Sequence, residues 1–551
     1  MKVTRITFVF ICFLVFSFLI IGRLTFLQVI KGNIYKAQAK GQQENYKEIA
    51  GTRGDIYFND KGDKVLAATN QSTQFLYLVP QDIENDEEVA EELSKIIDID
   101  KEVIINKLSN KNSSFSLIKR KLCKTEIEAI EALEFDGIYL REELVRYYPH
   151  NTLASDVLGF VNNDNLGQYG IEGYFNDYLQ GESGWQKIAH GPFGKTLEGD
   201  GVLKGIDINL TIDKNIQEET EKVLAEYSDI FEYESAQVII MDPFSGKILA
   251  MADFPSYDPN LFDDLDISTF KNKAVQSLYE PGSVFKAITL ASVLNEGKIT
   301  PETTYEDKGY VMIGEQKINN YDNRVHGVKT MTEVLEKSIN TGVIFAQDQI
   351  PHKVFEKYLE RFGIFEKTGI ELQGETYSNN SGFKKGWEVN YATAAFGQGI
   401  DTTLIQMARA YCALANGGEL VKPHIVEGKT EKKRIILKDT ADMIVRMLVS
   451  VAENGYSKPA IVDGYNIAGK TGTSQISYSS LGMNQIGYSD QTWQSFIGFA
   501  PAFDPKFVIA IKLDNPNTKS SSESATLVFK DIAKYILDYW QIAPDKVDII
   551  E

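Results

Sequence analysis

The chain has 551 residues, of which 43% are hydrophobic and 24% are charged. This composition is typical of globular proteins and excludes collagen-like and fully disordered classes. Its 57 Lys and Arg against 77 Asp and Glu give a net charge of −20, so the chain has no electrostatic drive toward nucleic acid. At ~150 residues per domain, a chain of this length is expected to contain more than one domain.

The N-terminal segment carries the longest apolar run of the chain. Residues 6–21 are almost purely apolar, with Lys2 and Arg5 before them and Arg23 after them. A membrane-spanning helix needs ~20 residues, whereas a signal peptide has a shorter apolar segment followed by a small-residue cleavage site, which is missing here. The sequence therefore predicts an uncleaved anchor at residues 6–22. Basic residues on both sides leave its orientation open.

Residues 23–204 are predicted to form a stalk followed by a mixed α/β domain. The stretch 33–47 is polar and helix-prone, as a stalk would be, and a glycine cluster at 199–201 suggests a domain boundary near residue 204. The expected elements between them include a strand at 75–79 and acidic amphipathic helices at 87–97 and 125–133.

Residues 205–551 are predicted to form a second, α+β domain. A strand at 209–213 and a helix from Lys214 open it, and hairpins are expected at 236–250 and 495–513. Since long helices lie between the two hairpins, the sheet would be built from distant segments. The polar stretch 519–524 is interpreted as a surface loop with no further role.

Neither metal nor nucleotide chemistry is expected. The three cysteines and five histidines show no zinc-ligand spacing, and the cysteines imply no disulfide framework. Residues 464–471 match the phosphate-loop pattern G-x4-G-K-[ST]. That motif requires a flexible loop that opens a helix, whereas 465–468 has an extended pattern and Gly472 is a poor helix start.

Three short motifs point to serine acyl transfer. Ser283-Val-Phe-Lys286, Ser338-Ile-Asn340 and Lys470-Thr-Gly472 are the Ser-x-x-Lys, Ser-x-Asn and Lys-Thr-Gly elements of enzymes that handle penicillin. Each element recurs by chance elsewhere in the chain, so a single copy has little weight. Their order and the helical pattern at 287–294, directly after the first motif, select this set.

The first motif predicts an activated nucleophile. Ser283 and Lys286, three residues apart at a helix start, lie on one face. A serine hydroxyl needs a base, and Lys286 can act as that base if desolvation and the charge of Lys470 lower its pKa. The backbone N–H groups of Ser283 and Thr473 are the expected oxyanion donors.

The other two motifs are expected to hold the substrate. If residues 470–474 form a strand, Lys470 and Gly472 share one face and Thr471 and Thr473 the other. The missing side chain of Gly472 would let the substrate approach closely. In the remaining motif, Ser338 can relay a proton and Asn340 can bind a substrate amide.

These motifs resemble the active site of penicillin-binding proteins. The similarity extends over Tyr279–Lys286 and Ala468–Ser474, and further segments resemble class B members: 53–56, 146–149, 170–174, 396–400 and 496–501. Ser474 and Gln494 stand where the family often has alanine, which leaves the acceptor side open. The Glu-Pro-Gly-Ser and Lys-Thr-Gly-Thr forms are closer to division-type members.

The resemblance implies a fold and a reaction. The expected fold is a dimerisation-type pedestal within 23–204 and a transpeptidase domain at 205–551, with an antiparallel sheet flanked by helices. Ser283 would attack the penultimate D-alanine of a peptidoglycan stem peptide, and an acceptor amine would resolve the acyl-enzyme. Lys470, Thr471 and Thr473 would bind the terminal carboxylate, which β-lactams imitate, and no cofactor is required.

The same resemblance implies a location and partners. The substrate lies outside the plasma membrane, so residues 1–5 would be cytoplasmic and the catalytic domain extracytoplasmic. A membrane glycosyltransferase and division proteins are the expected partners of the pedestal, at the septum. Two alternatives stay open: a D,D-carboxypeptidase or β-lactamase-like hydrolase, for which no base for water is identified, and a non-catalytic scaffold or sensor, against which the unbroken motifs argue.

Overall fold

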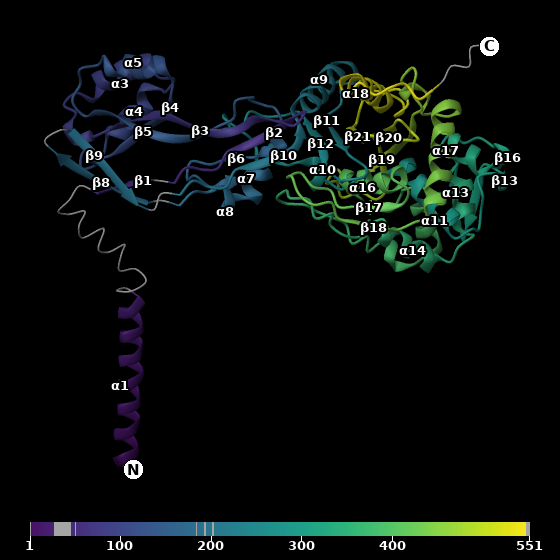
Figure 1. Cartoon of the computed structure of the whole chain (residues 1–551), viewed down its shortest axis with the longest axis horizontal. Coiled ribbons are helices and arrows are strands. Elements are labelled where there is room, and N and C mark those ends of the chain that lie inside the picture. Colours follow the sequence, from purple (N-terminus) through teal and green to yellow (C-terminus); the bar gives the residue numbers. More distant parts are fainter. Residues whose placement is uncertain are drawn as a thin grey trace. The chain divides into compact units, whose positions relative to one another are not determined.

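The computed structural model describes residues 2–26, 46–49, 51–182, 184–191, 194–200 and 203–546 (Figure 1). The chain forms two compact units whose segments alternate along the sequence. The smaller unit takes Met1–Asp55, Asn70–Val145 and Asp177–Asp207, and the larger takes Ile56–Thr69, Arg146–Asn176 and Ile208–Glu551. The larger unit therefore includes two segments that precede the predicted boundary near residue 204.

The N-terminal segment is helical. Helix α1 runs over Lys2–Thr25 and contains the predicted anchor. Within the described residues, no helix combines the length and the hydropathy needed to cross a membrane. The anchor therefore stays a prediction. Most of the predicted stalk, residues 33–45, lies outside the described residues, and strand β1 (Tyr46–Ile49) follows it.

The smaller unit packs helices on strands, as the sequence predicts. Its strands are the end of β3 (Asp63–Leu78), β4 (Ser116–Leu122) and β5 (Ile138–Tyr147), and its helices are α3 (Asp86–Ile96), α4 (Lys101–Leu108) and α5 (Lys124–Glu131). Buried Leu76, Leu93 and Leu108 belong to their shared apolar core. A second sheet pairs β1 with β8 (Gly184–Gly191) and β8 with β9 (Gly194–Asp200).

A five-stranded antiparallel sheet forms the centre of the larger unit. Its order is β12-β11-β21-β20-β19, with β11 at Ser235–Met241, β12 at Ile248–Phe254, β19 at Ala468–Ser477, β20 at Tyr488–Ala500 and β21 at Phe507–Asp514. Both predicted hairpins and the assembly from distant segments are confirmed. Strand β10 (Ile208–Asp213) and helix α9 (Lys214–Phe231) also begin as predicted.

Helices cover both faces of this sheet (Figure 1). Helices α9 and α18 (Ala525–Tyr539) pack on one face over a large apolar core, because alternate strand residues such as Val238 and Ile511 point to that side. Helix α16 (Leu404–Ala415) contacts β11 and β21 without contributing to that core. Helix α11 (Lys286–Asn295) packs against α13 (Asn340–Gln347) and α17 (Lys438–Asn454).

Candidate active site

The first motif lies in a short turn that leads directly into α11. Ser283 belongs to the 3₁₀ helix η4 (Gly282–Phe285), and Lys286 is the first residue of α11. Side chains three apart eclipse each other in a 3₁₀ turn, so Ser283 and Lys286 share one face, as predicted. The Tyr411 hydroxyl donates to the Val284 carbonyl at 2.7 Å and fixes the turn from α16.

Lys286 is fully buried, and its ammonium group meets the second motif. Its Nζ lies 2.6 Å from the Ser338 carbonyl oxygen, 3.1 Å from Ser338 Oγ and 2.7 Å from Asn340 Oδ1. Burial lowers the pKa of Lys286 well below its ordinary value; the positive charge of Lys470 lowers it further, and the charge of Asp322 opposes the shift. The sequence predicted both lowering causes.

The second buried lysine approaches the same serine from the sheet. Lys470, on the edge strand β19, has its Nζ 3.1 Å from Ser338 Oγ and 3.1 Å from the Thr471 carbonyl oxygen. Burial lowers the pKa of Lys470 to about 7. Since Ser338 Oγ lies 3.1 Å from both lysine nitrogens, it can pass a proton between them.

Ser338 occupies the tight link between α12 (Met331–Glu336) and α13. Its φ is +54°, in the left-handed region that non-glycine residues seldom adopt. The Ile339 N–H donates to the Val334 carbonyl at 2.9 Å, and Asn340 Nδ2 donates to the Asn319 carbonyl at 3.1 Å. These bonds hold the strained serine toward the lysines.

Ser283, Ser338, Thr471 and Thr473 line one cavity of about 250 Å³. Thr473 Oγ1 accepts the Ser521 N–H at 3.2 Å and lies 3.1 Å from Ser521 Oγ. Ser520, Ser522 and Glu523 line the same cavity. The prediction that residues 519–524 form only a surface loop is therefore wrong, because Ser521 is buried against Thr473.

Gln494 and Ser474, the two departures from the family pattern, both support walls of this cavity. Gln494 on β20 is fully buried; its amide donates to the Thr518 carbonyl at 2.8 Å and accepts from Ser524 Oγ at 2.5 Å, so it holds the ends of the serine-rich loop. Ser474 Oγ donates to the Glu280 carbonyl at 2.7 Å, just before the nucleophile turn.

Gly472 has a packing role that the sequence did not reveal. A Cβ at this position would lie 2.5 Å from Ser495 Oγ and 2.9 Å from the Pro281 carbonyl oxygen. The glycine therefore lets the turn before Ser283 pack closely on β19. The close approach of substrate to Gly472 stays a prediction. The oxyanion role of the Ser283 and Thr473 N–H groups also stays a prediction.

Residues 464–471 do not adopt the geometry of a phosphate loop. Lys470 lies inside β19 rather than in a loop that opens a helix. Its ammonium group points to Ser338, and the strand continues through Gly472 to Ser477. The structural context that a phosphate loop requires is therefore missing.

Comparisons with known proteins identify the family. Residues 48–210 match the model of the penicillin-binding protein dimerisation domain, and residues 236–534 match that of the penicillin-binding protein transpeptidase domain. Stage V sporulation protein D of Bacillus subtilis (strain 168) is 34% identical over 538 residues, which cover 93% of this chain and 82% of that protein. The chain is a class B penicillin-binding protein.

Further relatives agree with this assignment. The probable peptidoglycan D,D-transpeptidase PenA of Neisseria gonorrhoeae is 30% identical over 98% of this penicillin-binding protein and 94% of that chain. The crystal structure of penicillin-binding protein 3 from Mycobacterium tuberculosis, complexed with aztreonam, aligns with a TM-score of 0.68. The alignment covers 91% of this chain and 98% of the Mycobacterium tuberculosis chain at 24% identity, so it shows that the two proteins share a fold.

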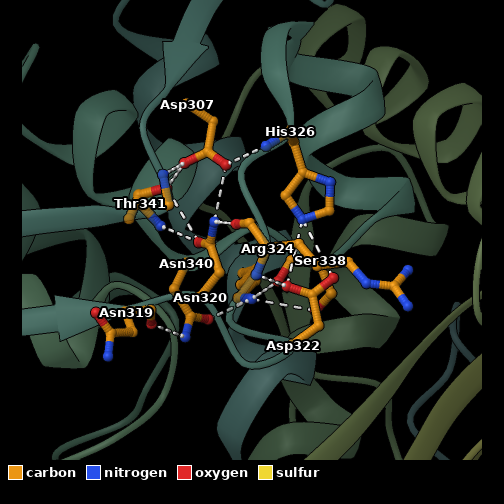
Figure 2. A network of polar contacts seen from close by, with 11 residues as sticks. Asp307, Asn319, Asn320, Asp322, Arg324, His326, Ser338, Asn340 and Thr341 are labelled. Atoms are coloured by element: carbon orange, nitrogen blue, oxygen red, sulfur yellow. Dashed lines mark hydrogen bonds and ion pairs between the residues drawn. The ribbon is translucent and has the colours of Figure 1, made fainter.

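A polar network beside the motifs of this penicillin-binding protein was missed at the sequence level (Figure 2). Asp307 accepts hydrogen bonds from Thr341 Oγ1 at 2.7 Å, the His326 N–H at 2.8 Å and Asn320 Nδ2 at 2.9 Å. Burial acts to raise the pKa of Asp307, but these bonds outweigh it and the pKa is lowered. No motif or periodicity marks these residues, since contacts across a loop bring them together.

Proposed function

We propose that this penicillin-binding protein is a peptidoglycan D,D-transpeptidase whose nucleophile is Ser283. The observation that carries the proposal is the position of buried Lys286, one turn after Ser283. Its Nζ lies within hydrogen-bond distance of Ser338 and Asn340. A lysine with a lowered pKa can be neutral at physiological pH and act as a base. The relatives named D,D-transpeptidases support the same reaction.

The proposed acylation step transfers one proton. Lys286 Nζ takes the proton of Ser283 Oγ as that oxygen bonds to the penultimate D-alanine carbonyl carbon. The peptide C–N bond then breaks, and the proton goes to the leaving amine of the terminal D-alanine. Lys470, Thr471 and Thr473 would hold the terminal carboxylate, and the N–H groups of Ser283 and Thr473 would stabilise the oxyanion.

Deacylation reverses this chemistry with a different amine. The amine of a second stem peptide attacks the Ser283 ester carbon and forms a new peptide bond. The ester bond between that carbon and Ser283 Oγ breaks, and the proton released by the nitrogen returns through Lys286 to Ser283 Oγ. A β-lactam would stop the enzyme at the acyl-enzyme. Ser338 and Asn340 would orient Lys286 and the substrate amide during both steps.

Intact-mass spectrometry with penicillin tests this proposal. We expect a stable adduct of one penicillin per chain over hours, mapped by peptide analysis to Ser283. Hydrolysed penicillin without an adduct would indicate a carboxypeptidase or β-lactamase-like hydrolase. Intact penicillin without an adduct would indicate a scaffold or sensor.

We also propose that residues 6–22 anchor the chain in the plasma membrane, with residues 1–5 in the cytoplasm and the catalytic domain outside. The apolar sequence 6–21 and the extracytoplasmic substrate support this topology. The full chain is expected to sediment with membranes and to be released by detergent but not by high salt. A chain that begins at Asn33 should stay in the supernatant. Full-length protein that remains soluble without detergent would contradict the anchor.

The proposed partners follow from the family. Residues 23–204 would contact a membrane glycosyltransferase and division proteins at the septum. The division-type motifs and relatives named FtsI support this role.

A further inference from the structure

An Asp–His pair faces the catalytic cavity, and none of the three motifs uses it. His326 Nε2 lies 3.3 Å from Asp322 Oδ2, and both residues line the cavity of about 250 Å³ together with Ser283. The His326 side chain is 14% exposed. Because Nε2 faces the carboxylate, Nδ1 is the ring nitrogen left to accept a proton.

The loop that carries this pair is held in place (Figure 2). Asp307 accepts the His326 N–H at 2.8 Å and the Thr341 hydroxyl at 2.7 Å. The Arg324 N–H donates to Asp322 Oδ1 at 3.0 Å and keeps that carboxylate beside the histidine. Thr341 directly follows Asn340, which contacts Lys286, so the pair and the base are positioned by the same helix start.

During deacylation, one proton of the incoming ammonium ion has no base assigned to it. An alkyl amine with a pKa of ~10.4 reaches the enzyme as an ammonium ion, which has no free electron pair for the ester carbon. Lys286 handles the proton that the nitrogen releases during attack. The ammonium ion must lose an earlier proton, and this step needs a second base.

We propose that His326, oriented by Asp322, is the catalytic base that removes this first proton from the acceptor ammonium ion. This inference rests on the proposed transpeptidase function. The N–H bond of the ammonium ion breaks, its electron pair stays on nitrogen, and the proton moves to Nδ1 of His326 and then to solvent. The free amine attacks the ester, and its remaining surplus proton returns through Lys286 to Ser283 Oγ.

The charges around the cavity suit a cationic acceptor. Two carboxylates, those of Asp322 and Glu523, and one ammonium group, that of Lys337, line it. His326 also lines an adjoining cavity of about 340 Å³, whose other titratable or charged groups are those of Asp322, Arg324, Glu336, Lys337 and Tyr456. Asp322 is the carboxylate in direct contact with the ring, so it orients the imidazole.

Acceptors that differ in basicity test the proposal. The full-length His326→Asn enzyme is given a soluble donor peptide ending in D-alanyl-D-alanine and either a lysine-like amine or hydroxylamine, which is largely unprotonated at pH 7. We expect product formation with the lysine-like amine to fall ~10²-fold at pH 7 and to recover as the pH rises. The rate with hydroxylamine and the acylation of Ser283 by penicillin should be unchanged.

His352→Asn is the matched control, because His352 stacks on Tyr391 and does not line the catalytic cavity. The His352→Asn variant should form product at the unmodified rate with both acceptors. Asp322→Asn is the second variant and should reproduce the loss with the lysine-like amine.

The remaining outcomes overturn either the role of His326 or the proposed function. An equal loss with both acceptors, unchanged rates with both, or loss of penicillin acylation in both cavity variants would overturn the role of His326. Failure of the unmodified enzyme to acylate Ser283 would instead overturn the proposed function.

Discussion

Replacement of Ser283 by alanine is expected to abolish covalent labelling by penicillin. Ser283 lies in η4, one turn before the buried base Lys286, and lines the catalytic cavity. Two other cavity hydroxyls already have polar partners: Ser338 Oγ contacts the two lysines, and Ser521 Oγ contacts Thr473 Oγ1. The variant loses one hydroxyl from a half-buried position, so we expect its melting temperature to stay close to that of the unmodified protein. Intact-mass spectrometry after hours with penicillin measures the effect.

Ser521→Ala is the matched control, since it removes another hydroxyl from the same cavity. It should still give the adduct on Ser283, with a modest change in rate because Thr473 loses a hydrogen-bond partner. A persistent adduct in the Ser283→Ala protein, mapped to any other serine, would contradict the assignment of the nucleophile.

The parts of the site that the sequence could predict depend on short-range geometry. Ser283 and Lys286 share a face because the chain between them is a single turn. The strand considered at residues 470–474 lies within β19, and the helical pattern at 287–294 lies within α11. The meeting of three motifs across spans such as Lys470 to Ser338 came from the family resemblance, which supplies tertiary information that periodicity lacks.

The parts that the sequence could not predict depend on tertiary contacts. The loop at 519–524 has the composition of a solvated surface loop, but buried Gln494 on a neighbouring strand holds it against Thr473. His326 and Asp322 lie in a loop without periodicity and are fixed by Asp307. The pattern of residue types in a single sequence carries no record of such contacts.

Replacement of Lys286 by methionine is expected to slow penicillin acylation by about 10² to 10⁴-fold, because the variant lacks the base for Ser283. Methionine keeps the buried volume but leaves the Ser338 carbonyl and Asn340 Oδ1 without the donor they now share, at a cost of about 1–3 kcal/mol in the free energy of unfolding. Stopped-flow measurement of acylation and a thermal melt separate the two effects.

The pH dependence distinguishes a base from a merely structural lysine. Burial and the charge of Lys470 lower the pKa of Lys286 well below its ordinary value, so its neutral form extends to lower pH than that of a free lysine and is lost as the pH falls through that pKa. The acylation rate of the unmodified enzyme should therefore fall as the pH is lowered, which gives the pH–rate profile an acid limb. The residual acylation rate of Lys286→Met should not show this acid limb. Lys470→Met is the control: it removes a charge that lowers the pKa of Lys286, so its acid limb should move to higher pH. An acid limb that survives in Lys286→Met would assign the titration, and with it the base, to another group.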